Sequence, residues 1–188
     1  EKVIEVFGMP YFLPTHQGRA AEHILSSVLV RPDTYVPMNY HFTTSKAHVV
    51  ANGGTVLEFI RPEGLEVTSE HPFKGDMDTD ALEALIADKG ADAVSFVRVE
   101  AGTNLIGGQP VSLTNMEQVS AICKSHGIPL VMDASLIADN LFHRFPNLRV
   151  ASVENGSKFL PGMFERLRVV GRKMNGWFPE DPVETFRR

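Results

Sequence analysis

Residues 93–133, AVSFVRVEAGTNLIGGQPVSLTNMEQVSAICKSHGIPLVMD, contain two short apolar runs on either side of an amphipathic stretch. The runs Ala93–Val99 and Ile128–Met132 have the length and composition of buried strands. Between them, apolar residues recur at helical spacing over Met116–Cys123, and Gly127 predicts the end of this helix. The order strand, helix, strand predicts a βαβ unit, and therefore an α/β fold with a mostly parallel sheet flanked by helices.

The same alternation extends toward the N-terminus. An apolar stripe over Ala21–Leu29 predicts a helix, and the run Thr55–Ile60 predicts a strand that leaves a glycine turn. A further helix is marked by the apolar residues of 82–86, and Asp80 with Glu83 resembles a capping box at its start.

Composition excludes several classes of protein. The chain has 188 residues, 43% apolar and 22% charged, which is typical of a folded globular domain rather than a disordered chain. It has no apolar run of about 18 residues that could cross a membrane, and its start lacks the apolar core of a signal peptide. A net charge of −5 argues against nucleic-acid binding. The single cysteine, Cys123, excludes an internal disulfide, so we expect a cytoplasmic location.

Two candidate binding segments lie in the N-terminal third. Gln17-Gly18-Arg19 directly precedes the first helix, where backbone N–H groups and an arginine could bind a phosphate. The alternative is a glycine turn with a solvated arginine. In Asn39–Thr44, an aromatic residue beside hydroxyls could stack on a planar cofactor, or it could belong to the core and precede a capping threonine.

Two further candidates follow the predicted strands of 93–133. The loop Asn104–Pro110 contains two glycines and is either a functional loop or a plain turn between strand and helix. Asp133 ends an apolar strand, where an unpaired carboxylate is costly. It could pair with the protonated ring nitrogen of pyridoxal phosphate, or it could cap the next helix. The seven histidines have no spacing typical of a metal site, so we predict no transition-metal site.

Together these segments resemble the tryptophanase and tyrosine phenol-lyase family of pyridoxal-phosphate-dependent β-eliminating lyases. The resemblance covers about residues 4–143. Its most specific motifs are Pro14–Arg19, Asn39-Tyr40 with Phe42–Thr44, Phe73-Lys74-Gly75, Gly107–Ser112 and Val131–Asp133 with Asn140.

The resemblance implies a fold and an activity. Residues 1–143 would form part of the cofactor-binding large domain of a fold-type I enzyme, incomplete at both ends, and residues 144–188 a divergent tail of uncertain fold. The reaction would be β-elimination on an amino acid such as tyrosine or tryptophan, giving pyruvate, ammonia and the leaving group. The family also implies a homo-oligomer, a tetramer when complete, and possible use of a potassium ion, with no nucleic-acid or membrane partner.

The resemblance further implies roles for individual residues. Six would bind the cofactor: Gln17, Gly18 and Arg19 at its phosphate, Phe42 on its ring, Asn104 near its phenolic oxygen and Asp133 at its ring nitrogen. Thr43 corresponds to a catalytic position near the leaving group, where tyrosine phenol-lyases typically carry threonine and tryptophanases aspartate.

Two departures from the family pattern concern catalysis. The family has arginine three residues after the aspartate, and here that residue is Leu136. The family's Schiff-base lysine segment, Ser-x-Lys-Lys-Asp, is not found, and Lys158 in Asn155–Lys158 is the candidate replacement. Lys158 could instead be a surface residue of a glycine turn. The alternative to a working lyase is therefore a truncated, non-catalytic fragment or pseudoenzyme of the family.

Overall fold

The computed structural model describes residue 11 and residues 13–136 of the chain. Contacts divide the chain into two units, one of Gly18–Arg149 and one of Glu1–Gln17 with Val150–Arg188. The sheet belongs to the first unit. Lys158, the boundary predicted near residue 143 and the tail after it lie outside the described residues.

Four parallel strands form the sheet. They are β1 (Tyr35–Met38), β2 (Thr55–Glu58), β3 (Val97–Glu100) and β4 (Leu130–Asp133), in the order β2-β1-β3-β4. The predicted α/β class with a parallel sheet is confirmed.

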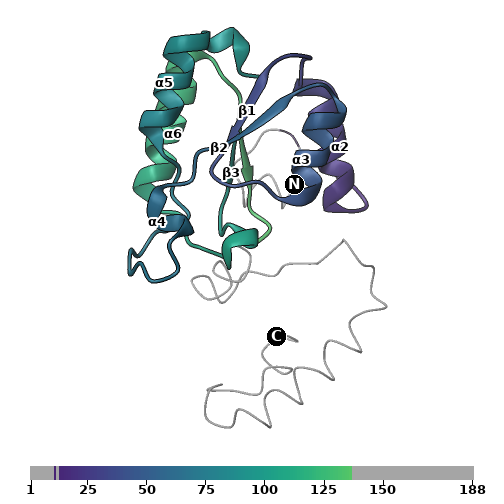
Figure 1. Ribbon diagram of the computed structural model, residues 1–188. Helices are drawn as coiled ribbons and strands as arrows, with labels where there is room; N and C mark the ends of the chain where they lie inside the picture. Colours follow the sequence, from purple (N-terminus) through teal and green to yellow (C-terminus); the bar gives the residue numbers. More distant parts are fainter. Residues whose placement is uncertain (1–10, 12, 137–188) are drawn as a thin grey trace, which may run out of the picture. The chain divides into compact units, whose positions relative to one another are not determined.

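Helices cover both faces of this sheet. They are α2 (Gly18–Leu29), α3 (Thr43–Ala51), α4 (Pro62–Leu65), α5 (Thr79–Lys89) and α6 (Leu113–His126). Figure 1 shows α2 and α3 on one face and α5 and α6 on the other. Among the described helices, none is both long and apolar enough to span a membrane.

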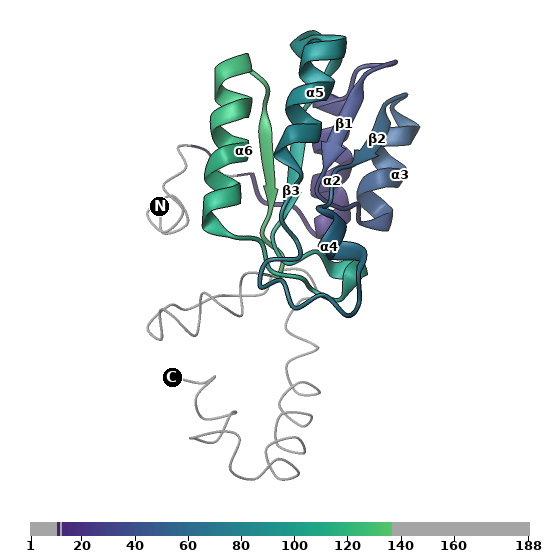
Figure 2. The same ribbon diagram turned by 60° about the vertical axis from the view of Figure 1, so that its left-hand side comes forward.

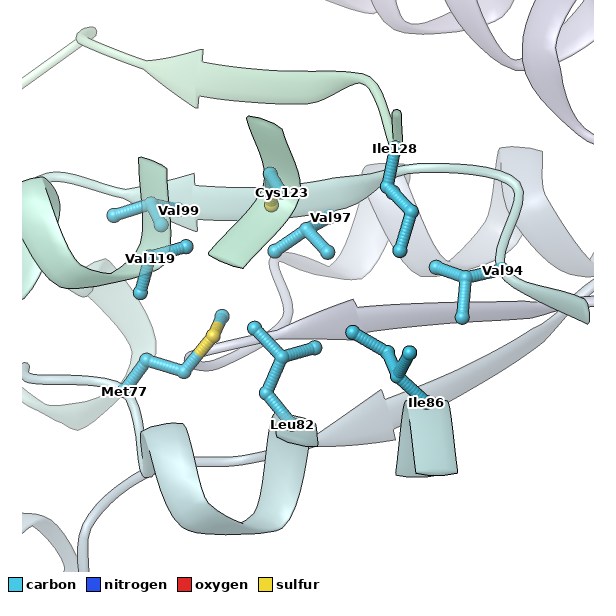
Figure 3. Packing of buried hydrophobic residues seen from close by; sticks show 9 residues of the cluster. All are labelled: Met77, Leu82, Ile86, Val94, Val97, Val99, Val119, Cys123 and Ile128. Carbon is cyan, nitrogen blue, oxygen red and sulfur yellow. The ribbon is translucent and has the colours of Figure 1, made fainter. Parts of the chain in front are cut away.

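Alternation along β3 divides the core between the two faces. Val97 and Val99 pack with residues of α5 and α6, among them the fully buried Leu82 and Val119 (Figure 3). Phe96 lies in the second cluster, with residues of β1, α2 and α3. Because successive side chains of a strand point to opposite faces, Arg98 and Glu100 lie on the α2/α3 face, as Phe96 does.

The helix ends follow local signals with one exception. The Ser112 hydroxyl accepts the Asn115 N–H at 3.0 Å and begins α6, while Gly127, at φ 66°, ends it as predicted. The predicted capping box at Asp80 is wrong. The cap is Asp78, whose side chain accepts the Ala81 N–H at 3.0 Å. The Asp78 N–H bonds the Phe59 carbonyl, so the extended chain ends at Asp78 and the helix starts two residues earlier.

Candidate functional site

The strand order creates a switch point between β1 and β3. From β1 the chain moves outward to β2, then passes back beyond β1 to β3 and β4. The loops that follow β1 and β3 therefore lead to helices on opposite faces, α3 and α6 (Figure 2). Open α/β sheets bind ligands at the carboxyl ends of strands beside such a point.

Asn39 joins the ends of β1 and β3 at the switch point. This fully buried side chain donates to the carbonyls of Glu100 at 3.0 Å and Gly75 at 2.9 Å, and accepts the Glu100 N–H at 2.9 Å. Its own N–H donates to the Arg98 carbonyl at 3.4 Å. The side chain thus extends the hydrogen-bond ladder past the last backbone pair and fixes the spacing of the loops.

Three charged side chains meet on the α2/α3 face near the ends of β3 and β4. Arg98 Nη2 donates to Asp133 Oδ2 at 2.6 Å, and Arg98 Nη1 lies 3.2 Å from Glu100 Oε2. The side chains of Arg98 and Glu100 are 4% and 6% exposed, whereas that of Asp133 is 23% exposed. We call these residues the Arg98 trio. One cation between two carboxylates gives the trio one net negative charge.

Asp133 is the most accessible member of the trio. Burial raises the pKa of its carboxyl, but hydrogen bonds from Ser135 and the charge and hydrogen bond of Arg98 outweigh burial, and the pKa is lowered overall. The Ser135 hydroxyl and N–H donate to Asp133 Oδ1 at 2.6 and 3.0 Å. The carboxylate is therefore ionised at neutral pH.

The glycine-rich loop after β3 is closed by its own backbone. Gly107-Gly108 adopts left-handed φ angles of 89° and 70°, which favour glycine. The Thr103 N–H donates to the Gln109 carbonyl at 3.0 Å across the loop. The Asn104 N–H donates to Glu100 Oε1 at 3.0 Å, which links this loop to the Arg98 trio.

The segment Phe73-Lys74-Gly75 packs against that loop. The Gly75 N–H donates to the Pro110 carbonyl at 2.9 Å, and the Gly75 carbonyl accepts the Asn39 amide. A Cβ at Gly75 would lie 2.5 Å from the Gln109 carbonyl oxygen and 2.9 Å from that of Pro110. A side chain would separate the two segments, so this close approach requires glycine.

Helices α2 and α3 both begin at the carboxyl end of the sheet, because α2 leads into β1 and α3 follows it. Glu22 of α2 accepts hydrogen bonds from the hydroxyls of Thr44, at 2.5 Å, and Ser45 in the first turn of α3. A carboxylate at a helix N-terminus is favourable. Glu22 therefore holds the start of α3 against α2.

Most of the predicted site residues come to this end of the sheet. These are Gly18 and Arg19 in the first turn of α2, Phe42 and Thr43 at the start of α3, Asn104 after β3 and Asp133 at the end of β4. Arg19, Thr43 and Asn104 are exposed, and Phe42 is half-buried. Gln17 belongs to the other unit, and Lys158 lies outside the described residues. The roles of all these predicted site residues stay predictions.

Leu136 lies beside the loop that follows β3. A Cβ built on Gly102, which has a φ of 83°, would lie 3.2 Å from the Leu136 Cβ. An apolar side chain thus occupies the position where the resemblance implies an arginine.

Arg98, Glu100 and Glu22 were not predicted from the sequence as residues of this site. A signal for the first two was present, because strands buried on both faces of a parallel sheet are normally apolar throughout, and β3 reads Val-Arg-Val-Glu. Over residues 13–136, no group of three or more His, Cys, Asp or Glu side chains is arranged to hold a metal ion.

Comparison with known families supports the resemblance. The family model for "Beta-eliminating lyase" matches residues 1–160. The tyrosine phenol-lyase of Symbiobacterium sp. (strain SC-1) is 42% identical over 142 residues, which are 76% of this chain and 31% of that protein. That of Fusobacterium nucleatum subsp. nucleatum is 44% identical over 142 residues, with the same coverage. The chain spans about a third of the length of these curated relatives.

Solved structures share the fold at low sequence identity. An alanine aminotransferase from Pyrococcus furiosus matches with a TM-score of 0.52 and 17% identity, over 64% of this chain and 28% of that chain. A tyrosine aminotransferase from Leishmania infantum matches with a TM-score of 0.51 and 16% identity, over 64% and 29%. The sheet therefore has the fold of these aminotransferases, in agreement with the fold type I that the resemblance implies. Since the family match covers most of the sequence, the chain belongs to the pyridoxal-phosphate-dependent β-eliminating lyase family.

Proposed function

We propose that this chain supplies the cofactor cradle of a carbon–carbon lyase that eliminates the β-substituent of an aromatic amino acid. The observation that carries the proposal is Asp133, an ionised carboxylate at the carboxyl end of β4, in a trio with one net negative charge. A pyridine ring becomes cationic when its nitrogen is protonated. A partly buried carboxylate in a group with excess negative charge complements such a ring.

The rest of the cofactor fits the same face of the sheet. Arg19 and the N–H groups at the start of α2 present positive charge to a phosphate. Phe42, half-buried just before α3, offers an aromatic face to the ring. Both helices cover the face that carries the Arg98 trio.

Pyridoxal phosphate, when bound, withdraws electrons from the α-carbon of an attached amino acid. In the proposed division of roles, Gln17, Gly18 and Arg19 hold the phosphate and Asp133 keeps the proton on the ring nitrogen. Asn104 lies near the phenolic oxygen. Lys158 carries the cofactor and removes the α-proton.

The proposed substrate is tyrosine, with phenol, pyruvate and ammonia as products. The curated relatives named above are tyrosine phenol-lyases, and Thr43 matches the residue that the resemblance associates with that activity. The Thr43 hydroxyl, exposed at the start of α3, would bind near the leaving group. A homo-oligomer, a cytoplasmic location and a potassium ion belong to the same proposal.

Leu136 favours a second candidate, a member of the family that binds the cofactor without catalysis. The apolar side chain beside Gly102 provides no cation to keep a phenolic oxygen ionised. Loss of that cation would alter the electronic state of the bound ring without removing the contacts of Arg19 and Asp133.

One experiment separates the two candidates. The 188-residue chain is titrated with pyridoxal phosphate, reduced with borohydride and mapped by peptide mass, and a parallel sample with tyrosine is assayed for pyruvate. A stoichiometric adduct on Lys158 together with pyruvate release supports the lyase. Saturable binding without adduct or pyruvate supports the non-catalytic candidate. Absence of saturable binding contradicts both.

Replacing Arg19 with alanine should weaken binding of pyridoxal phosphate by about 1.5–3 kcal/mol, because a charge-assisted hydrogen bond to the phosphate is lost. Equilibrium dialysis measures the change. The matched control is Arg31→Ala, since Arg31 lies at the amino end of β1 and donates to the Asp92 carbonyl at 2.7 Å. Equal weakening in both variants would remove Arg19 from the phosphate site.

A further inference from the structure

The proposed function assigns no role to Arg98, yet burying its charged side chain has a large cost in free energy. It is the charged residue between two buried valines of an interior strand, and its side chain is 4% exposed. A guanidinium withdrawn from water requires compensation by charged partners. Its two terminal nitrogens meet Glu100 on the same strand and Asp133 on the next strand.

Glu100 and Asp133 are direct partners in the register of β3 and β4. Neighbouring parallel strands lie about 4.8 Å apart, and like charges placed opposite one another are destabilising. Two carboxyls on directly paired residues tend to share a proton unless a cation lies between them. Arg98 occupies that place, and arginine keeps its charge throughout the physiological pH range.

Resting on the proposed function, we propose that Arg98 is a positioning residue that neutralises Glu100, so that Asp133 remains ionised to receive the protonated ring nitrogen of the cofactor. The site then needs both carboxylates. Without Glu100, the charge of Arg98 cancels that of Asp133. Without Arg98, the two carboxyls compete for one proton.

Hydrogen bonding leaves Asp133 able to take this additional donor. A carboxylate offers about four acceptor sites. Three donors from the described part of the chain use Asp133: Arg98 Nη2, the Ser135 N–H and the Ser135 hydroxyl. A ring N–H would be the fourth. The 23% exposure of the Asp133 side chain, against 6% for Glu100, makes Asp133 the carboxylate that a ligand can reach.

Other charged groups at the ends of the strands have separate partners. Glu58, which ends β2, lies 2.5 Å from His41 Nδ1 and 3.6 Å from Lys46 Nζ. Glu22 of α2 accepts hydrogen bonds from two hydroxyl groups at the start of α3. Arg19, also of α2, is the exposed cation assigned above to the phosphate. The charge that faces Asp133 from β3 is therefore set by Arg98 and Glu100.

The test compares four forms of the full chain: wild type, Glu100→Gln, Arg98→Met and the double variant. Affinity is measured for pyridoxal phosphate and for 1-deazapyridoxal 5′-phosphate, in which carbon replaces the ring nitrogen. Glu100→Gln should weaken binding of pyridoxal phosphate about tenfold, since one nearby charge shifts a pKa by about one unit or more. The double variant restores one net negative charge and should return to within about threefold of wild type.

The deaza probe should bind all four forms alike, because it presents no ring nitrogen to Asp133. Equal losses for both probes, or no restoration in the double variant, would reduce Arg98 and Glu100 to a structural role. If Arg98→Met does not fold, Glu100→Gln and the double variant still decide the question.

A second readout needs no cofactor. Carbon-13 NMR follows the Asp133 and Glu100 carboxyls through a pH titration. In Arg98→Met, one carboxyl should titrate well above its usual range, and in the double variant Asp133 should return toward that range. Titration of both carboxyls near pH 4 in Arg98→Met would overturn the role of Arg98. Unchanged affinity of an Asp133→Asn control, with the expected titrations, would instead contradict the proposed function.

Discussion

Replacing Arg98 with methionine should lower the free energy of unfolding at pH 7 by about 3–5 kcal/mol, the range found when one partner of a buried ion pair is removed. Methionine fills a similar volume, so the loss reports charge rather than a cavity. Glu100 and Asp133 would face each other across β3 and β4 without a cation. The variant can avoid the repulsion by protonating one carboxyl. Keeping a carboxyl protonated costs about 1.4 kcal/mol for each pH unit between its usual pKa near 4 and the pH of the solution.

The stabilities of the wild type and of Arg98→Met should change with pH in opposite directions. In the wild type, the pKa of Asp133 is lowered in the folded state, so its contribution to stability is present above about pH 4 and is lost as the pH falls through the lowered value. In Arg98→Met, a carboxyl of raised pKa makes stability fall as the pH rises. The two unfolding curves in urea should therefore converge toward low pH.

The control for Arg98→Met is Lys124→Met, an exposed residue of α6, which should change stability by less than about 0.5 kcal/mol. A loss in Arg98→Met that is the same at pH 4 and pH 7 would show that packing, rather than charge, accounts for the effect.

Replacing Leu82 with alanine should lower the free energy of unfolding by about 2–5 kcal/mol. Leu82 is fully buried, and in Figure 3 it lies in the middle of the cluster between Met77 and Ile86, facing the valines of β3. Alanine would leave a cavity between the sheet and the layer formed by α5 and α6, because the backbone of these elements limits how far the surroundings can relax.

Leu113→Ala is the matched control for this core substitution. Leu113 begins α6 and is 71% exposed, so the same chemical change should cost less than about 0.5 kcal/mol. Urea unfolding followed by circular dichroism measures both variants. Similar losses for Leu82→Ala and Leu113→Ala would contradict the assignment of Leu82 to the core.

Much of the fold could be predicted from the sequence, since its signals are local. The stripe at 21–29 gave α2, and Gly127 marked the end of α6. Strand β1 was not predicted from the sequence. It has four residues and contains Pro37, and proline normally argues against an interior strand. The cap of α5 was misplaced because a long-range bond from Asp78 to the Phe59 carbonyl, absent from any local pattern, sets where the extended chain ends.

The candidate site was predicted only in part. Arg19, Phe42 and Asp133 follow glycine, aromatic and strand-end signals that are visible in the sequence. The Arg98 trio depends on strand register and on which face of β3 each residue occupies. Register is a property of the assembled sheet, so the pairing of Arg98 with Asp133, 35 residues away in sequence, needed coordinates.

The strand order also sets a sequence of folding events. Pairing of β1 with β2 joins Tyr35 to Thr55, and pairing of β3 with β4 joins Val97 to Leu130, whereas β1 meets β3 through Met38 and Arg98, 60 residues apart. Closing the longest loop has the largest entropic cost, so we expect two βαβ halves to form first and to dock last along the β1–β3 seam. Asn39 and Arg98 bridge that seam. A slow step in refolding would therefore coincide with the appearance of the proposed cofactor site, and a ligand bound there would hold together two halves that are already formed.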